Sequence, residues 1–344
     1  MKYITFTVPC YNSEEYMRHC IDNLVAVGDD IEVIIVNDGS KDSTGEIAAE
    51  YEKKYSTIVR AIQKENGGHG SGVMTGIHNA SGLFFKVVDS DDWVETADVL
   101  VMIDIIKKHL AEEKTIDLYI TNYVYQHAKD NSQFVMHYRK FLPIDKEFTW
   151  PEMKHIRLET VFLMHSLMYR LDILKESKME LPNHTFYVDD IYAYVPLPYV
   201  KTIYYHDLDL YHYFIGREGQ SIDYETMCKR YEQQQRVFEI MFSSYSLETL
   251  RTFDRRLYKY MYQFLMIIAA ITIMTTVGTN TDKEKRKVVF KEYGQKLQSI
   301  DKDLFNKLRY HSPCMMAYIM PFYRIRSFIV RRLYRFYQRR LKLG

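Results

Sequence analysis

The stretch FKVVDSDDW, residues 85–93, joins an apolar run directly to three carboxylates. Lys86 apart, residues 83–88 have the continuous apolar character of a strand that is covered on both faces. Asp89, Asp91 and Asp92 follow where that strand would leave the core, and in open α/β sheets the ligand crevice lies at such strand ends. Neighbouring acids repel one another unless a cation joins them, so the stretch predicts a cation-dependent site. The alternative is an Asp-rich turn before a helix that starts near residue 95.

The residues on either side of this stretch alternate between strand and helix patterns. Apolar runs typical of strands occupy residues 3–8, 31–37 and 57–63, and helical patterns occupy residues 12–24, 43–55 and 70–79. Asn12 is expected to cap the first helix, with Glu15 three residues on. The alternation predicts an α/β fold with a mostly parallel sheet and flanking helices. In such a sheet Asn12, Asp38 and the acidic cluster would meet at one edge, because each follows a parallel strand.

The second half of the chain has a different character. From about residue 118 to residue 217 the strands are shorter, and after residue 221 the pattern is helical. We therefore predict a catalytic domain over residues 1–220 and a helical region over residues 221–344. The uncharged residues 260–281 are long enough to span a membrane, but Gln263 and four threonines favour a buried helix of a C-terminal bundle.

Composition places the chain among ordinary globular proteins, with 47% hydrophobic and 26% charged residues in 344. The 4 cysteines have no paired spacing, which argues against a zinc site or a disulfide framework and favours a reducing compartment. The first residues already have a strand pattern, which argues against a signal peptide.

The net charge of +1 hides an asymmetry along the chain. Residues 304–344 contain ten Lys or Arg and no Asp or Glu, which leaves 36 basic (46 − 10) and 45 acidic residues elsewhere. A helix beginning at Pro321 would carry an apolar stripe backed by arginines. The stripe is Phe322, Ile325, Ile329, Leu333 and Phe336, and the basic face is Arg324, Arg331, Arg335 and Lys342. This basic amphipathic helix predicts binding to an anionic membrane surface. The sequence contains no nucleic-acid-binding motif. The alternative is that the tail helix packs its apolar stripe on the helical region.

Four segments together carry a family resemblance. They are VPCYNSEEYMRHCIDNL, VIIVNDGSKDST, NGGHGSGVMTGIHNASGLFFKVVDSDDW and FYVDDIYAYVPL…LYHYFIGREGQSI. In order and spacing they resemble the family 2 inverting glycosyltransferases of the bacterial polysaccharide and glycoconjugate type, over residues 2–222. The resemblance implies the GT-A fold with an Asp-x-Asp motif. It also implies a metal-dependent, inverting transfer of a sugar from a nucleotide-sugar donor, expected to be a UDP-sugar, to an acceptor hydroxyl.

The resemblance also implies a set of site residues. Asp190, with Asp189 beside it, would be the catalytic base, and Mn²⁺ or Mg²⁺ would be held by Asp91, Asp89 and His212. The nucleotide-sugar residues would be Pro9, Tyr11, Asn12, Asp38, Gly68, His69, Asp89, Asp91 and Arg217. The glycines of NGGHGSG are expected to let the backbone approach the donor before a helix N-terminus.

The partners implied are the nucleotide-sugar donor and a glycan or lipid-linked acceptor, with the protein in the cytoplasm, peripheral on the inner face of the cell membrane. Two other classes remain open. A sugar-phosphate nucleotidyltransferase shares the sheet type, but its glycine-rich signature should follow the first strand, where VPCYNSEE stands. A non-catalytic nucleotide- or sugar-binding module would bind UDP without transfer.

Overall fold

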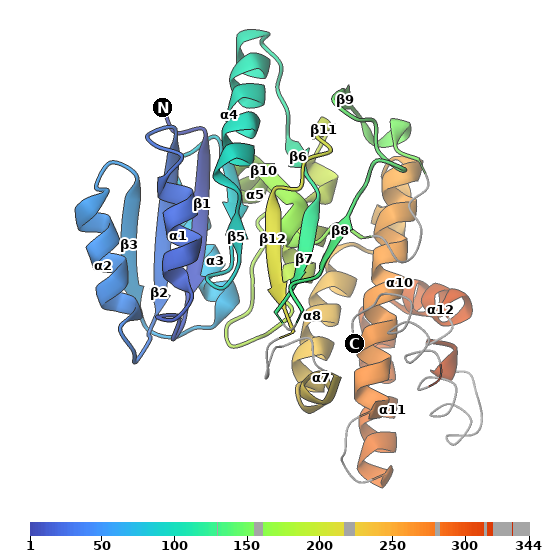
Figure 1. Ribbon diagram of the computed structural model, residues 1–344. Helices are drawn as coiled ribbons and strands as arrows, with labels where there is room; N and C mark the ends of the chain where they lie inside the picture. The colour runs from blue at the N-terminus through green and yellow to red at the C-terminus, as the bar shows by residue number, and fades with distance from the viewer. Residues whose placement is uncertain are drawn as a thin grey trace. The chain divides into compact units, whose positions relative to one another are not determined.

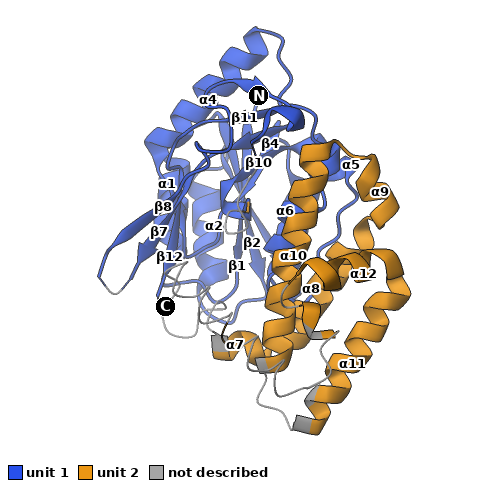
Figure 2. Cartoon of the chain, turned by 90° about the vertical axis from the view of Figure 1, so that its right-hand side faces the viewer, with its two compact units in different colours: residues 1–154, 162–217 blue, residues 155–161, 218–344 orange. Residues whose placement is uncertain are grey.

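The computed structural model describes residues 1–128, 130–154, 161–216, 224–278, 283–312, 315–318 and 332. Arg217 and, apart from Arg332, the predicted tail helix from Pro321 onward lie outside the described residues. The chain forms two compact units, which are described separately (Figure 2). Unit 1 comprises residues 1–154 and 162–217, and unit 2 comprises residues 155–161 and 218–344.

Unit 1 is built on an eight-stranded sheet whose order is β3-β2-β1-β4-β10-β6-β11-β9 (Figure 1). Its strands are β1 Ile4–Cys10, β2 Ile31–Asp38, β3 Val59–Lys64, β4 Phe84–Val87, β6 Leu118–Ile120, β9 Glu147–Phe148, β10 Leu167–Arg170 and β11 Ile203–Tyr205. The first four strands pair in parallel, as predicted, while β10 is antiparallel to both of its neighbours. The α/β fold class is therefore confirmed.

The strand order reverses between β1 and β4. The chain passes outward from β1 through β2 to β3, and then returns to place β4 on the other side of β1. At such a switch point the connections on the two sides diverge, which opens a crevice at the carboxyl ends of the strands. The loops after Cys10 and Val87 lie at this switch point, because β1 and β4 pair directly.

The helices of unit 1 follow the alternation expected from the sequence. They are α1 Met17–Val25, α2 Thr44–Lys54, α3 His69–Asn79, α4 Thr96–Ala111, α5 Leu171–Glu176 and α6 Asp189–Tyr194, with 3-10 turns at Trp150–Glu152, Met164–Ser166 and Leu197–Tyr199. Helix α3 lies directly on β1, because Gly76 leaves room for the Thr7 side chain, whose Oγ1 would be only 2.2 Å from a Cβ at that glycine. Gly76 and Gly72, which faces Pro9 of β1, thus serve helix–sheet packing.

One helix start differs from the prediction. Helix α1 begins at Met17, after Tyr16, and has no side-chain cap, so the predicted Asn12 cap is wrong. Asn12 instead adopts φ 49°, a left-handed conformation that Asn tolerates better than most residues. Its backbone nitrogen donates to Ser40 Oγ at 3.0 Å and its Oδ1 accepts from the Lys41 backbone nitrogen at 2.9 Å. The residue therefore ties the loop after β1 to the loop after β2.

A second, four-stranded sheet in unit 1 has the order β5-β12-β7-β8. Its strands are β5 Trp93–Val94, β7 Tyr123–His127, β8 Gln133–Met136 and β12 Tyr211–Ile215. Strand β5 begins directly after the acidic cluster and pairs with Tyr211 and His212 of β12. This pairing brings a segment more than a hundred residues away in sequence to the carboxyl end of β4.

Unit 2 is helical over its described residues. Its helices are α7 Tyr224–Lys229, α8 Tyr231–Ser244, α9 Leu247–Thr252, α10 Arg255–Gly278, α11 Lys283–Ile300 and α12 Lys302–His311, with a 3-10 turn at Met315–Tyr318. Residues Arg255–Val277 are long and apolar enough to cross a membrane, with a mean hydropathy of 1.7, but 72% of that stretch is buried in the protein. Helix α10 contacts α7, α8, α9 and α11. Its buried Thr272, Thr275 and Thr276 hydroxyls donate to backbone carbonyls one turn back, which satisfies them without water.

Candidate functional site

The acidic cluster stands at the switch point, and Asp92 is its most buried member, at 1% exposure. The Tyr211 hydroxyl donates to Asp92 Oδ2 at 2.6 Å, and the Phe214 backbone nitrogen donates to Oδ1 at 2.8 Å. Burial, and then the charge of Asp89, raise the pKa of Asp92 well above its ordinary value, although these two hydrogen bonds oppose the rise. Strand β12 therefore supplies the partners of a carboxylate in the loop between β4 and β5.

Asp89 has a histidine partner. His69, the first residue of α3, places Nε2 2.7 Å from Asp89 Oδ1. Burial lowers the pKa of His69, but the charge of Asp89, with Asp189 and Asp38 contributing, raises it above its ordinary value. Burial raises the pKa of Asp89, but the charge and the hydrogen bond of His69 more than offset this, so the pKa of Asp89 lies below its ordinary value. The two residues therefore form an ion pair at the carboxyl end of β4.

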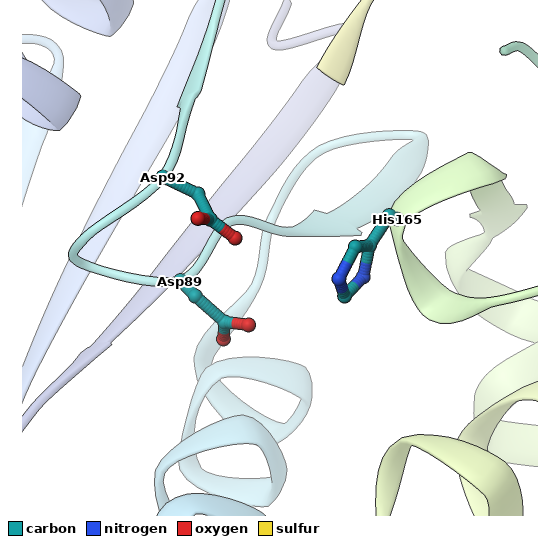
Figure 3. A group of neighbouring side chains, drawn as sticks. All are labelled: Asp89, Asp92 and His165. Carbon is teal, nitrogen blue, oxygen red and sulfur yellow. The ribbon is translucent and has the colours of Figure 1, made fainter. Parts of the chain in front are cut away.

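A second histidine faces the same carboxylates from the other side. His165, in the 3-10 turn before β10, is 5% exposed and directs its imidazole toward Asp89 and Asp92 (Figure 3). Neither of its ring nitrogens has a hydrogen-bond partner among the described residues. Its ring is stacked on Tyr211, with ring centroids 4.7 Å apart, and edge-on to Tyr213 at 4.4 Å. Burial lowers the pKa of His165 to about 4, so the imidazole is neutral at pH 7.

Lys86 lies behind His165 as a fully buried residue of β4. Its Nζ donates to the backbone carbonyl oxygen of His165 at 2.5 Å and approaches that of Leu167 at 3.4 Å. The ammonium also lies 5.4 Å from the centre of the Tyr211 ring. Burial lowers the pKa of Lys86 to about 7. This lysine therefore joins β4 to the segment that carries His165.

The residues present fit a divalent cation. One oxygen each of Asp89 and Asp92 and one nitrogen of His165 all lie within 4.8 Å of one another. Opposed ligands on an octahedral Mg²⁺ at about 2.1 Å are separated by about 4.2 Å, so small side-chain adjustments would bring the three atoms onto one ion. Carboxylate oxygens suit Mg²⁺ and Mn²⁺, and the imidazole nitrogen is a softer ligand.

Asp38 anchors the glycine-rich turn at the end of β2. Its Oδ1 accepts from Lys64 Nζ at 2.6 Å and from the Gly67 backbone nitrogen at 2.9 Å, and its Oδ2 accepts from the Gly68 backbone nitrogen at 2.7 Å. Asn66 Nδ2 donates to the Asp38 carbonyl oxygen at 2.9 Å. The turn that leads to His69 is therefore held by a carboxylate that is itself only 3% exposed.

The same turn contacts the loop that precedes the predicted base. The His184 backbone nitrogen donates to the Gly67 carbonyl oxygen at 2.7 Å. Gly68 adopts φ 84° and ψ 171°, a region that only glycine occupies readily, and a Cβ at Gly68 would lie 3.0 Å from the His184 backbone nitrogen. His184 and Tyr187 also have positive φ, 49° and 65°, so the backbone is strained just before α6. Strain of this kind clusters at functional sites.

Asp189 and Asp190 open helix α6, and both side chains are half-buried. Burial, and then the charge of Asp189, raise the pKa of Asp190 well above its ordinary value. Burial also raises the pKa of Asp189. The charge of His69 opposes this rise, and the charge of Asp89 adds to it. The hydrogen bond from His184 to Gly67 and the contact between His69 and Asp89 connect the loop before α6, the start of α3 and the end of β4.

The other predicted site residues have varied positions. Pro9 lies in β1 beside Gly72 of α3, and Tyr11, after β1, is 50% exposed at the switch point. Asp91 is half-buried and is not one of the three clustered ligand residues.

His212 is not brought to the carboxylates. It stacks on Trp93, with ring centroids 5.0 Å apart, and its Nε2 lies 3.6 Å from Glu95 Oε1. Successive residues of a strand face opposite sides, so His212 points away when its neighbour Tyr211 points to Asp92.

Sequence analysis did not assign roles to His165, Lys86 or Tyr211. Lys86 could have been singled out from the sequence, because a lysine within an otherwise apolar strand is expected to be buried with that strand, which is rare for lysine. Nothing in the local pattern distinguishes His165. Among the described residues, a cavity of about 420 Å³ between the end of α4 and β9 holds none of the predicted site residues.

Comparison with known proteins identifies the class. Residues 5–164 match the family Glycosyl transferase family 2. The chain is 36% identical over 135 residues to the glycosyltransferase GlyA of Streptococcus pneumoniae serotype 4, an alignment that covers 39% of this chain and 18% of GlyA. It is 32% identical over 194 residues to the uncharacterized glycosyltransferase EpsJ of Bacillus subtilis, covering 54% of this chain and 53% of EpsJ. The chain thus aligns with about half or less of the length of these relatives.

The fold has a solved counterpart in TarS 1–349 of S. aureus, determined in complex with UDP-GlcNAc. The TM-score is 0.66 at 20% identity, and the alignment covers 97% of this chain and 92% of the TarS chain. Residues 5–164 thus match the family 2 glycosyltransferases, and the GT-A fold implied by the motifs is confirmed.

Proposed function

We propose that this protein transfers a sugar, with inversion, from a UDP-sugar to an acceptor hydroxyl in the synthesis of a cell-surface polysaccharide or glycoconjugate. The observation that carries the proposal is the hydrogen-bonded pair of Asp89 and His69 at the switch point of a domain that matches family 2, with the loop before Asp189 bonded to the turn before His69. Two further classes of residue are then needed, one for the nucleotide and one for the acceptor proton.

Asp38 and the loop after β1 are the proposed base-binding residues. Within the described residues Asp38 Oδ2 accepts one hydrogen bond, so it retains a lone pair for an imide N–H such as that of uracil. Pro9, Tyr11 and Asn12 border this position at the end of β1. The structural counterpart TarS was solved with UDP-GlcNAc, which supports a UDP-sugar donor.

Asp190 is the proposed general base, with Asp189 beside it. In the reaction the acceptor O–H gives its proton to the Asp190 carboxylate while the acceptor oxygen attacks the anomeric carbon from the face opposite the leaving group. The bond from that carbon to the diphosphate oxygen breaks, and the nucleoside diphosphate leaves with the electron pair. Burial beside Asp189 raises the pKa of Asp190, which makes its carboxylate a stronger base than an exposed one.

Asp89 and Asp91 are the proposed carboxylate ligands of Mg²⁺ or Mn²⁺. When bound, the cation neutralises charge on the departing diphosphate as a Lewis acid. His69 is proposed to contact the donor and to hold Asp89 ionised through their ion pair.

The test is transfer of labelled sugar from UDP-sugars by purified protein, compared with Asp190→Asn and Asp189→Asn. Asp190→Asn should keep UDP affinity, measured by calorimetry, but lose about two to four orders of magnitude in transfer rate. A larger loss in Asp189→Asn, with Asp190→Asn near normal, would move the base to Asp189. Release of pyrophosphate from a sugar phosphate and UTP would support the nucleotidyltransferase class. UDP binding without transfer from any donor would support the non-catalytic module.

We also propose that the protein acts in the cytoplasm at the inner face of the cell membrane, on a lipid-linked or glycan acceptor. The support is the run of ten basic and no acidic residues in 304–344. Sedimentation with anionic liposomes should separate the full chain from one ending near Ser312. If both stay in the supernatant at low salt, the tail does not bind membrane.

A further inference from the structure

We propose that an aromatic row across the second sheet, formed by Tyr213, Tyr125 and Phe134, binds a neutral pyranose ring of the acceptor. The inference rests on the proposed function, because it assumes that an acceptor hydroxyl reaches the donor at the switch point. It goes beyond that function by assigning the chemical class of the acceptor and the residues that bind it.

The pairing of the strands puts the three side chains on one face of the sheet. Strands β12, β7 and β8 lie side by side (Figure 1). Tyr125 of β7 is paired with Tyr213 of β12 and with Phe134 of β8, and directly paired residues of neighbouring strands project to the same face. The ring centroid of Tyr125 lies 5.7 Å from that of Tyr213 and 6.5 Å from that of Phe134. The three rings therefore form one continuous aromatic surface.

One end of the aromatic row lies at the proposed site. The ring of Tyr213 is edge-on to His165, with centroids 4.4 Å apart, and this imidazole faces the acidic cluster (Figure 3). The neighbouring pair on the same face, Tyr211 and Tyr123, is buried, and the imidazole contacts both of its rings. The aromatic row is thus the next row of the sheet beyond the part that His165 covers.

The other end of the aromatic row opens to solvent. Tyr213 and Tyr125 are half-buried, and Phe134 is 41% exposed. Single exposed apolar side chains are common on protein surfaces, but a contiguous apolar surface more often marks a binding site. The aromatic row runs from the acidic cluster to the surface, which suits an acceptor that extends away from the reacting hydroxyl.

The chemistry of this surface favours a neutral pyranose. A pyranose ring presents C–H groups on its faces, which pack on aromatic rings, and its hydroxyls can exchange hydrogen bonds with the phenol groups of Tyr125 and Tyr213. An open-chain polyol has no comparable flat face. Strands β7, β8 and β12 contain no Lys or Arg, so they offer no cationic partner to the phosphates of a polyol phosphate. The surface therefore suits a sugar ring without charge.

The experiment is saturation-transfer NMR with UDP bound, in which the aromatic protons of the protein are irradiated. The probes are the methyl pyranosides of glucose, galactose and N-acetylglucosamine, with ribitol phosphate as the open-chain anionic probe. We expect saturation to reach ring protons on one face of at least one pyranoside. Its dissociation constant should rise about tenfold in Phe134→Ala, because the apolar contact of one aromatic ring is lost.

Two further variants frame this result. Phe134→Trp keeps an aromatic face and should bind the pyranoside at least as tightly as wild type. Leu100→Ala removes a side chain that is 43% exposed on α4, and as the matched control it should leave binding unchanged. The absence of aromatic saturation from every pyranoside overturns the inference, and so does a pyranoside affinity in Phe134→Ala that is about equal to wild type. Binding of ribitol phosphate that Phe134→Ala weakens, with the pyranosides unaffected, would also overturn it and assign the aromatic row to a polyol phosphate.

Tyr125→Phe separates stacking from hydrogen bonding. The variant keeps the ring and removes only the hydroxyl, so most of the pyranoside affinity should remain. A loss of about tenfold in Tyr125→Phe, with Phe134→Ala near normal, would mean that the hydroxyl and not the aromatic surface binds the sugar.

Failure of this inference is distinguishable from failure of the proposed function. Transfer from a UDP-sugar with equal KM for the acceptor in wild type and Phe134→Ala would leave the function standing and remove the aromatic row from the acceptor site. Pyranoside binding that depends on Phe134, without transfer from any UDP-sugar, would do the reverse.

Discussion

Gly68 is the position where a single added methyl group should disturb both stability and donor binding. Its φ of 84° and ψ of 171° lie in a region that side chains rarely adopt, and a Cβ there would meet the His184 backbone nitrogen at 3.0 Å. Its own backbone nitrogen donates to Asp38, and the next residue, His69, pairs with Asp89. Gly68→Ala should therefore strain the turn and displace two proposed donor-binding residues.

Gly28 provides the matched control. It also has a positive φ, 95°, but nothing lies within 4 Å of the Cβ that alanine would add. Gly28→Ala should show the backbone cost alone, about 1–2 kcal/mol. Gly68→Ala should show about 1–3 kcal/mol for its less accessible conformation, and about 1–3 kcal/mol more for the contact with His184, for a total of about 2–6 kcal/mol.

Urea unfolding followed by tryptophan fluorescence measures this difference in unit 1, because both tryptophans, Trp93 and Trp150, belong to it. Calorimetry with UDP should show weaker binding for Gly68→Ala and wild-type binding for Gly28→Ala. Equal losses of stability in the two variants would refute the close contact with His184. Unchanged UDP affinity in a destabilised Gly68→Ala would refute the link from this turn to the donor.

Three further perturbations test other parts of the fold and site. Asp38→Asn should weaken UDP binding, measured by calorimetry, and destabilise unit 1 in urea unfolding. The reason is that the amide would place an N–H donor against backbone N–H groups that bond to a carboxylate in the wild type. A UDP affinity equal to that of wild type would exclude Asp38 from the donor site. Gly76→Ala should lower the free energy of unfolding by about 1–3 kcal/mol in urea, since the added Cβ meets the Thr7 side chain. Adding Thr7→Ala in a double variant should recover part of that loss. If the losses of the two single variants simply add in the double variant, the contact is contradicted. The transfer rate should rise with pH as the Asp190 carboxylate forms. Because the pKa of Asp190 is raised, the midpoint of this rise should lie above the ordinary aspartate pKa of about 3.9. A midpoint at or below that value would contradict the assignment of Asp190 as the base.

The parallel half of the fold follows from local sequence. Residues of β1, β2 and β4 are almost all buried, each strand is mostly apolar, and helical patterns separate the strands. That regularity also placed Asn12, Asp38 and the acidic cluster at one edge, because the ends of parallel strands lie together. The start of α1 was missed because Asn12 bonds across to the Ser40–Lys41 turn, a contact between loops that local patterns do not contain.

The antiparallel strands and their contribution to the site were not predictable in the same way. β10 and β12 are four and five residues long and lie in a region of loosened periodicity. Two contacts bring them to the site across 79 and 119 residues. Lys86 donates to the backbone carbonyl oxygen of His165, just before β10, and the Tyr211 hydroxyl of β12 donates to Asp92. Whether Tyr211 or His212 faces Asp92 depends on which face of β12 each residue takes, and a shift of one residue in register reverses the two.

The lysine in FKVVDSDDW nevertheless pointed beyond the local pattern. A residue that interrupts a buried strand with a charge has to find partners inside the protein, because leaving an ammonium unpaired in the core is costly. Lys86 finds two backbone carbonyl oxygens and an aromatic face, and all three belong to segments that carry or contact the metal-binding candidates. A buried charge beside an acidic cluster therefore marks where distant segments must come together, even when their own sequences give no indication of it. In this chain the alternating strands and helices of the first half can be predicted from the sequence, and the short strands after residue 118 cannot. Lys86 is therefore the most direct sequence evidence that segments of the second half pack against the end of β4.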